Sequence, residues 1–231
     1  MGGWIKDTLT MYGRVGRRAA ELLVRNAALV VPSIVLLEVI FIGRALLAPI
    51  GLLGGFLYVI AQYAALSAVL TFTSEAIRSG RVTAHEVGTA FGTYLSDLIS
   101  VGFVVFGLQL IASIVFQSIP PLYFFVMVVL MVFFNAAPEL VSIGKLNATE
   151  VLSASWQFIG TYWVEWFPPN LFLLMGVLGA ALIAPGGPLG PLAAVVASPA
   201  LAFLMLVRAL LFQELTTSSR RGRAFRRESS G

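Results

Sequence analysis

The chain has 231 residues, of which 58% are hydrophobic and only 11% are charged, and its formal net charge is +4. Soluble domains carry about 25% charged residues, so this chain lacks the polar side chains that a water-facing surface needs. The composition therefore excludes an ordinary soluble domain and indicates an all-α integral membrane protein.

Residues that commonly build catalytic or metal centres are scarce. The sequence has no cysteine and a single histidine, His85. A thiol nucleophile and a cysteine-ligated metal site are therefore excluded. One histidine provides too few ligands for a zinc site and no support for a Ser–His–Asp triad. We expect a protein that is not an enzyme and holds no metal and no cofactor.

The first element, residues 4–25, is predicted to be an amphipathic helix that lies in the membrane surface. Wound as an α-helix, it separates apolar from charged side chains. The arginines of the charged face either contact anionic lipid headgroups or simply meet water. The apolar face holds Ile5, Leu9, Tyr12, Ala19 and Leu23, and the opposite face holds Asp7, Arg14, Arg17, Arg18, Glu21 and Arg25.

Six apolar segments follow, each about as long as a helix must be to cross the hydrocarbon core. They cover residues 27–43, 50–72, 98–117, 119–137, 168–185 and 189–212. Two connections, "QSIPP" (117–121) and "APGGPLGP" (184–191), are uncharged and rich in turn residues, which predicts tight hairpins. We therefore expect a six-helix bundle in a single domain, residues 1–219, followed by a basic cytoplasmic tail, residues 220–231.

The positive charges predict the orientation of this bundle. With the N-terminus in the cytoplasm, every Lys and Arg except Arg44 falls on the cytoplasmic side of the six segments. Because cytoplasmic loops are enriched in Lys and Arg, we expect a multi-pass protein of the inner (plasma) membrane with both termini cytoplasmic. Its expected partners are anionic lipid headgroups on that side and other membrane proteins, and no nucleic acid.

Two polar stretches between the predicted spans share a pattern. Residues 83–92, "TAHEVGTAFG", and residues 147–156, "NATEVLSASW", match at their Ala, Glu, Val and second Ala positions. Both begin with the spacing of a capping box, in which a polar side chain caps the first helical turn and a Glu reaches back to the cap amide. Each stretch therefore predicts the start of a surface helix. The helix-cap candidates are Thr83, Glu86, Asn147 and Glu150.

The repeated stretch suggests an internal repeat of surface helix plus transmembrane hairpin. Its three units would cover about 1–77, 78–142 and 143–219. The tryptophans of the last surface helix suit the headgroup level, where indole rings are enriched. The candidates for contact with the lipid surface are Arg14, Arg17, Arg18, Arg25, Trp156, Trp163 and Trp166.

The segment 138–167, "PELVSIGKLNATEVLSASWQFIGTYWVEWF", resembles a group of prokaryotic six-span membrane proteins of unknown function. That group includes the membrane-anchoring region of some glycerophosphodiesterases. The likeness implies a six-span plan and no defined activity, and the chain has no phosphodiesterase domain. Where the group often has basic residues after the Trp, this chain has Gly160, Thr161 and Tyr162. The likeness is carried by Pro138, Glu150, Val151, Ala154, Ser155 and Trp156.

Polar residues inside spans are costly in lipid and are the usual candidates for function. Glu38, Gln62 and Gln109 each fall near the middle of a predicted span, where they could meet as a transport site or as hydrogen-bonding glue between helices. A second cluster, near the inner interface, would consist of Asn135, Glu139 and Asn170.

Two functions fit these features. The first is a non-catalytic scaffold, anchor or accessory subunit of a membrane assembly, because the sequence offers no catalytic constellation. The alternative is a small transporter or permease, which the mid-membrane polar cluster and the internal repeat would support.

Overall fold

The computed structural model describes residues 2–82, 87–116, 118–183 and 190–217. Throughout these ranges the chain forms helices and turns without strands, which confirms the all-α prediction. The helices are α1 (Gly2–Arg25), η1 (Ala27–Leu29), α2 (Val30–Glu38), η2 (Val39–Gly43), α3 (Arg44–Leu47), η3 (Ala48–Ile50), α4 (Leu52–Ser79), α5 (Val87–Thr93), α6 (Leu95–Phe116), α7 (Pro120–Phe133), α8 (Ala137–Ser142), α9 (Ala148–Ile183) and α10 (Gly190–Thr217).

Long apolar helices indicate a multi-pass membrane protein. In the described part of the chain, four segments are long and apolar enough to cross a bilayer: Leu52–Ser79, Gly88–Phe116, Pro120–Ser142 and Pro191–Thr217. The count rises to five if the bent pair of α1 and the helix after it forms one span. The structure thus confirms a helical protein with several apolar helices of membrane length, but it does not confirm a bundle of six separate spans. Residues 27–43 divide into shorter helical pieces, and the predicted span 168–185 continues an earlier helix and runs past the described residues.

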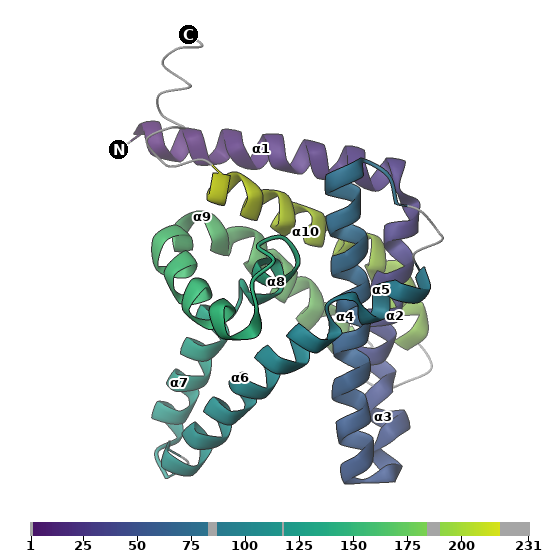
Figure 1. Cartoon of the computed structure of the whole chain (residues 1–231), viewed down its shortest axis with the longest axis vertical. Helices are drawn as coiled ribbons and strands as arrows, with labels where there is room; N and C mark the ends of the chain where they lie inside the picture. The colour runs from purple at the N-terminus through teal and green to yellow at the C-terminus, as the bar shows by residue number, and fades with distance from the viewer. Residues whose placement is uncertain (1, 83–86, 117, 184–189, 218–231) are drawn as a thin grey trace.

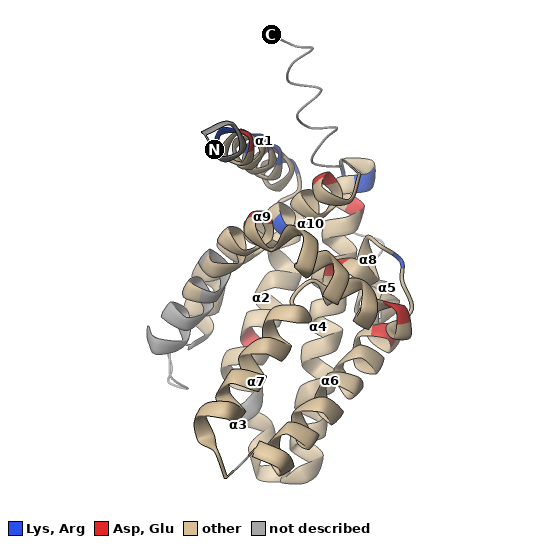
Figure 2. Ribbon diagram, turned by 90° about the vertical axis from the view of Figure 1, so that its left-hand side faces the viewer, with Lys and Arg blue, Asp and Glu red and all other residues tan. Residues whose placement is uncertain are grey.

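The first helix lies across one end of the bundle. The axis turns by 96° between Lys6–Arg25 and Ala27–Gly43 (Figure 1). Acidic and basic residues gather on α1 and the neighbouring helix ends, whereas the opposite half is almost free of charge (Figure 2). This distribution is typical of a helix at the membrane surface above apolar spans.

The face that α1 buries overlaps in part with the predicted one: Ala19 is buried, and Tyr12 and Leu23 are half-buried against the core. Its buried residues are Met11, Val15, Ala19 and Leu22, whereas Leu9 remains 62% exposed. The reason is that α1 packs along α10 and so buries a stripe selected by that neighbour. The arginines of α1 remain exposed, as predicted.

Tyr12 ties α1 to α9. Its hydroxyl donates a hydrogen bond to the backbone carbonyl of Glu165 at 2.6 Å. Burial, together with the nearby Glu165 carboxylate, raises the pKa of Tyr12 to about 12. The hydroxyl therefore keeps its proton, and its donor role, well above neutral pH.

Asn26 forms the corner between α1 and α2. Its side-chain amide donates to the carbonyls of Leu22 at 2.9 Å and Gly80 at 3.1 Å, and its side-chain oxygen accepts from the Val82 amide at 2.9 Å. Gly80 ends α4 with a φ of 76°, a left-handed conformation that glycine adopts at little cost. One buried side chain thus joins the α1–α2 corner to the loop after α4.

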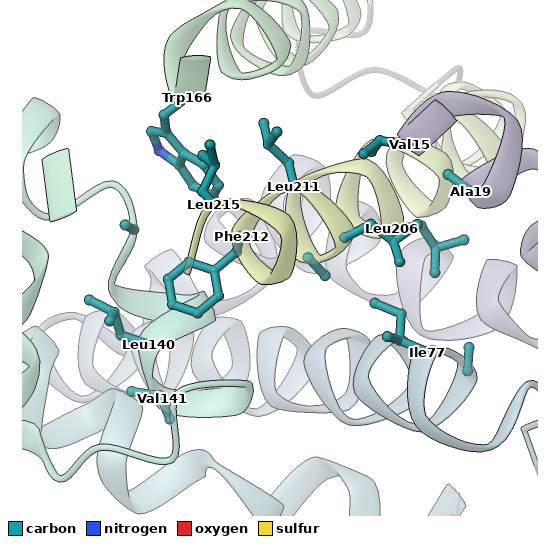
Figure 3. Close-up of a cluster of buried hydrophobic side chains, with 14 of the residues drawn as sticks. Val15, Ala19, Ile77, Leu140, Val141, Trp166, Leu206, Leu211, Phe212 and Leu215 are labelled. Carbon is teal, nitrogen blue, oxygen red and sulfur yellow. The ribbon is translucent and has the colours of Figure 1, made fainter. Parts of the chain in front are cut away.

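The last helix, α10, lies at the centre of the fold. Its buried residues pack against α1, α4, α8 and α9, and Figure 3 shows its apolar side chains facing those neighbours. Burial of large apolar side chains on several sides of one helix makes α10 the hub of the core. The core residues labelled in Figure 3, from α10 and from the helices around it, include Val15, Ile77, Leu140, Trp166, Leu206, Leu211, Phe212 and Leu215.

The two stretches with the shared pattern form different elements. Residues 87–93 form only the short helix α5, whereas Ala148–Ile183 forms one continuous helix with Pro168 and Pro169 inside it. The predicted separation into a surface helix and a span is therefore wrong for α9. Residues on both sides of the prolines form hydrogen bonds to other segments, as described below. The three-unit repeat stays a prediction.

Candidate functional site

Arg208 occupies a buried position in the middle of α10. Its side chain is 6% exposed and that of Glu139 on α8 is 1% exposed. The guanidinium donates from Nε to Oε1 at 2.6 Å and from Nη2 to Oε2 at 2.7 Å. This two-pronged arrangement is the strongest geometry that an ion pair between these groups can adopt. The charges of both residues are therefore neutralised inside the core.

The remaining donors of Arg208 reach α9 and the turn before α8. Its Nη2 donates to the backbone carbonyl of Asn135 at 2.8 Å, and its Nη1 donates to the Asn135 side-chain oxygen at 3.2 Å. Nη1 also hydrogen-bonds to the side-chain oxygen of Asn170. Arg208 thus joins three segments that lie far apart in the sequence.

The ring of Trp166 lies against the guanidinium of Arg208. Its indole N–H donates to the Asn135 side-chain oxygen at 3.0 Å, and its ring centre lies 5.0 Å from Cζ of Arg208. A cation at this distance from an indole face is attracted by the ring. The amide of Asn170 donates to the Trp166 carbonyl at 2.7 Å. We call these five residues the Arg208 cluster: Asn135, Glu139, Trp166, Asn170 and Arg208.

Local sequence explains how the cluster forms. Helix α7 ends at Phe133, and a turn leads to α8, where Pro138 occupies the first turn and cannot donate a backbone hydrogen bond. The interruption leaves the Asn135 carbonyl open to Arg208. On α9, Trp166 and Asn170 are one helical turn apart and so share a face. Trp166 and Asn170 lie on either side of Pro168 and Pro169.

The cluster is chemically closed. Among the described residues, every buried side-chain nitrogen and oxygen has a hydrogen-bond partner. Both carboxylate oxygens of Glu139 accept from Arg208 and its side chain is 1% exposed, so a substrate has no access to this carboxylate. The arrangement fits a polar clamp between helices better than an open binding site.

The predicted inner-interface residues lie together in this cluster. Asn135, Glu139 and Asn170 all bond to Arg208. The sequence reasoning missed Arg208 itself, because it assigned that charge to the cytoplasmic surface. The available signal was a single arginine inside the apolar run 191–212, which is costly in lipid unless it is paired.

The predicted mid-membrane residues do not share a site. Gln62 donates to the hydroxyl of Tyr58 at 2.9 Å, Glu38 is half-buried on α2, and Gln109 is exposed on α6. Within the described part of the chain, the hydrogen bond of Gln62 goes to Tyr58 and not to Glu38 or Gln109. The prediction that they meet in the bundle interior fails because the C-terminal half of α6, called its outer half below, diverges from α4 (Figure 1).

The predicted lipid contacts divide into two groups. Trp156 and Trp163 are exposed, at 55% and 58%, as are the four arginines of α1. Trp166 is a correction: it is fully buried, because its N–H and ring face serve the Arg208 cluster. The N–H of a buried indole needs a hydrogen-bond partner, and that of Trp166 has one inside the protein instead of in the headgroup layer.

The predicted helix caps are partly described. The backbone N–H of Asn147 donates to the Glu150 carboxylate at 3.2 Å, which is the Glu half of a capping box. Thr83 and Glu86 lie outside the described residues, as does His85. Within the described ranges, no group of three or more His, Cys, Asp or Glu is placed to hold a metal.

The comparisons add no relative to this picture. No family model, curated protein or solved structure matches the chain. The resemblance to prokaryotic six-span membrane proteins therefore stays a prediction.

Proposed function

We propose that the chain is a non-catalytic multi-pass membrane protein that serves as a scaffold, anchor or accessory subunit of a membrane assembly. In this proposal the outer half of α6 is the surface that receives a partner. The observation that carries it is the exposure of Gln109 in the middle of an apolar helix.

Gln109 lies on the side of α6 that faces the rest of the molecule. It follows Leu98, which is 4% exposed, by about three helical turns and so shares nearly the same face. Yet Gln109 is exposed, because the outer part of α6 leaves α4. An amide that faces hydrocarbon gains about 0.6–2 kcal/mol from a hydrogen bond to a neighbouring helix. A transmembrane helix with a polar side chain at this depth would supply that bond.

The surroundings of Gln109 are suited to helix packing. Phe106, three residues before Gln109 and therefore on a neighbouring side of α6, is 59% exposed. A large exposed apolar side chain next to the amide can pack against a second helix. The closed Arg208 cluster and the separation of Glu38, Gln62 and Gln109 favour this function over a permease with a mid-membrane site.

Site-specific cross-linking tests the proposal. A photoreactive amino acid in place of Phe106 is expected to link the chain to one membrane protein in native membranes. The same group in place of Phe56, which is 64% exposed on α4, should link mainly to lipid.

Gln109→Leu should then abolish the protein cross-link from position 106, because it removes the amide without changing the apolar surface. The matched control, Gln157→Leu on the exposed part of α9, should leave the cross-link intact. A chain that gives no protein cross-link and moves a solute across liposomes by itself would favour the permease instead.

A further inference from the structure

A cavity opens beside the Arg208 cluster, between α1, the end of α8 and the end of α10. Its volume is about 660 Å³. Small-molecule sites commonly have volumes of about 300–1,000 Å³, so this space is large enough for a ligand. It lies at the end of the bundle that carries α1, where charged residues gather (Figure 2).

The inner wall of this cavity is apolar. It is formed by Leu140 and Ile143 around the end of α8 and by Leu210 and Phe212 on α10. Leu140, Leu210 and Phe212 belong to the main core, and Figure 3 shows Phe212 and Leu140 near each other there. Because those three residues are at most 5% exposed, the apolar surface that a hydrocarbon chain can contact comes from the half-buried Ile143 and Leu146.

The rim of the cavity holds two arginines, Arg14 and Arg18, and one carboxylate, that of Glu214. Arg14 and Arg18 line it from α1, one helical turn apart. Arg14 is 3.5 Å from Glu214 of α10, but its side chain is 66% exposed, and exposed pairs of this kind contribute little. Arg14 can therefore turn to a stronger anion, and Arg18 lies beside it. Gln213 and Thr216 add hydrogen-bonding groups to the same rim.

An apolar wall beneath two arginines matches an anionic amphiphile. We propose that this cavity binds one anionic phospholipid, with its phosphate at Arg14 and Arg18 and the upper part of an acyl chain against Ile143 and Leu146. The lipid would lie between α1 and α10 and would be distinct from lipid that merely surrounds the helices. The site does not depend on the assembly role proposed above.

The basic tail is a poor alternative occupant. The tail 220–231 contains five arginines and one glutamate. Its net positive charge opposes entry beside Arg14 and Arg18 and favours an anion there.

Lipid retention by the purified full-length chain tests the site. In a neutral detergent, native mass spectrometry should show one phosphatidylglycerol retained per chain and much weaker retention of phosphatidylcholine. The variant Arg14→Gln/Arg18→Gln should bind phosphatidylglycerol at least roughly tenfold more weakly. The reason is that each basic residue near a lipid surface adds to the electrostatic attraction for an anionic headgroup.

The matched control is Arg17→Gln/Arg25→Gln, which removes the same charge from exposed positions of the same helix that do not line the cavity. It should retain phosphatidylglycerol within about twofold of the wild type, a difference that corresponds to about 0.4 kcal/mol. Equal losses in both double variants would mean nonspecific attraction and would overturn the proposal.

Two further measurements separate lipid from other ligands. Thr217→Trp fills the mouth of the cavity without changing charge and should reduce lipid retention. Glycerol phosphate, which has the headgroup chemistry without acyl chains, should bind far more weakly than the lipid. If it binds equally well, or if an acidic peptide displaces the lipid completely at equal concentration, the acyl-chain part of the proposal is wrong.

Discussion

Arg208 shows how one residue can be both costly and central. A lone guanidinium inside an apolar bundle would lose much of its hydration energy. Here it faces a carboxylate on one side, two asparagine oxygens on another, and an indole ring at 5.0 Å. Removal of only one partner leaves a buried charge without compensation, so the cluster is far more sensitive to single than to paired changes.

Replacement of Arg208 tests this asymmetry. Arg208→Met should lower the free energy of unfolding by about 3–5 kcal/mol, because Glu139 is left buried and unpaired. The double variant Arg208→Met/Glu139→Leu should recover much of that loss. Thermal unfolding in detergent, measured for both variants and each single change, checks the prediction. A double variant no more stable than Arg208→Met would show that the loss comes from packing and not from the charge.

At the scale of helices, the structure depends on corners and interruptions. The break between α7 and α8 exposes a carbonyl for Arg208, and the 96° corner after α1 places that helix across the bundle. Asn26 holds this corner through three hydrogen bonds to α1 and to the loop after α4. Its side chain is 5% exposed, so water cannot replace these bonds.

Asn26→Ala is therefore expected to loosen the corner. Groups left without partners should cost about 1–3 kcal/mol, and α1 should separate from the bundle more often. Hydrogen exchange should rise in the first turns after residue 80 and along α1. Thr10→Ala, an exposed change on the same helix, should alter stability by no more than about 0.5 kcal/mol. If hydrogen exchange in Asn26→Ala equals that of the wild type, then apolar packing alone holds α1 at the corner and the prediction is wrong.

At the scale of the whole molecule, the two ends of the bundle differ in charge. Helix α1 lies beside the end of α10, where Arg14 is 3.5 Å from Glu214. The turns between α3 and α4 and between α6 and α7 lie at the opposite end (Figure 1). If both charged termini are cytoplasmic, as the positive charges predict, then the two turns face the exterior.

Single cysteines test this orientation, since the chain has no natural cysteine. In intact cells, Leu52→Cys and Ile119→Cys should react with a membrane-impermeant maleimide. Thr10→Cys and Thr217→Cys should react only after the membrane is opened. The reverse pattern would invert the predicted orientation, and a mixed pattern within either pair would contradict an even number of crossings between the ends.

Several features could be predicted from the sequence because they depend on local chemistry. The low fraction of charged residues requires apolar helices, and the spacing of Asn147 and Glu150 produces a capping contact wherever the helix lies. The prediction that Asn135, Glu139 and Asn170 lie near one depth also came from local position along apolar runs. Their hydrogen bonds to Arg208 agree with that placement, while their role stays a proposal.

Other features were decided only by tertiary packing. Periodicity shows that α1 has an apolar side, but its contact with α10 selected the stripe of Met11, Val15, Ala19 and Leu22 for burial. Likewise, helical spacing places Trp166 on the apolar face of its helix with Phe158 and Ile159, but only the tertiary structure places its ring against the guanidinium of Arg208. The sequence by itself therefore determined a helical membrane protein with a charged end. The tertiary structure decided which polar groups pair inside it, because pairing depends on contacts between residues far apart in the chain.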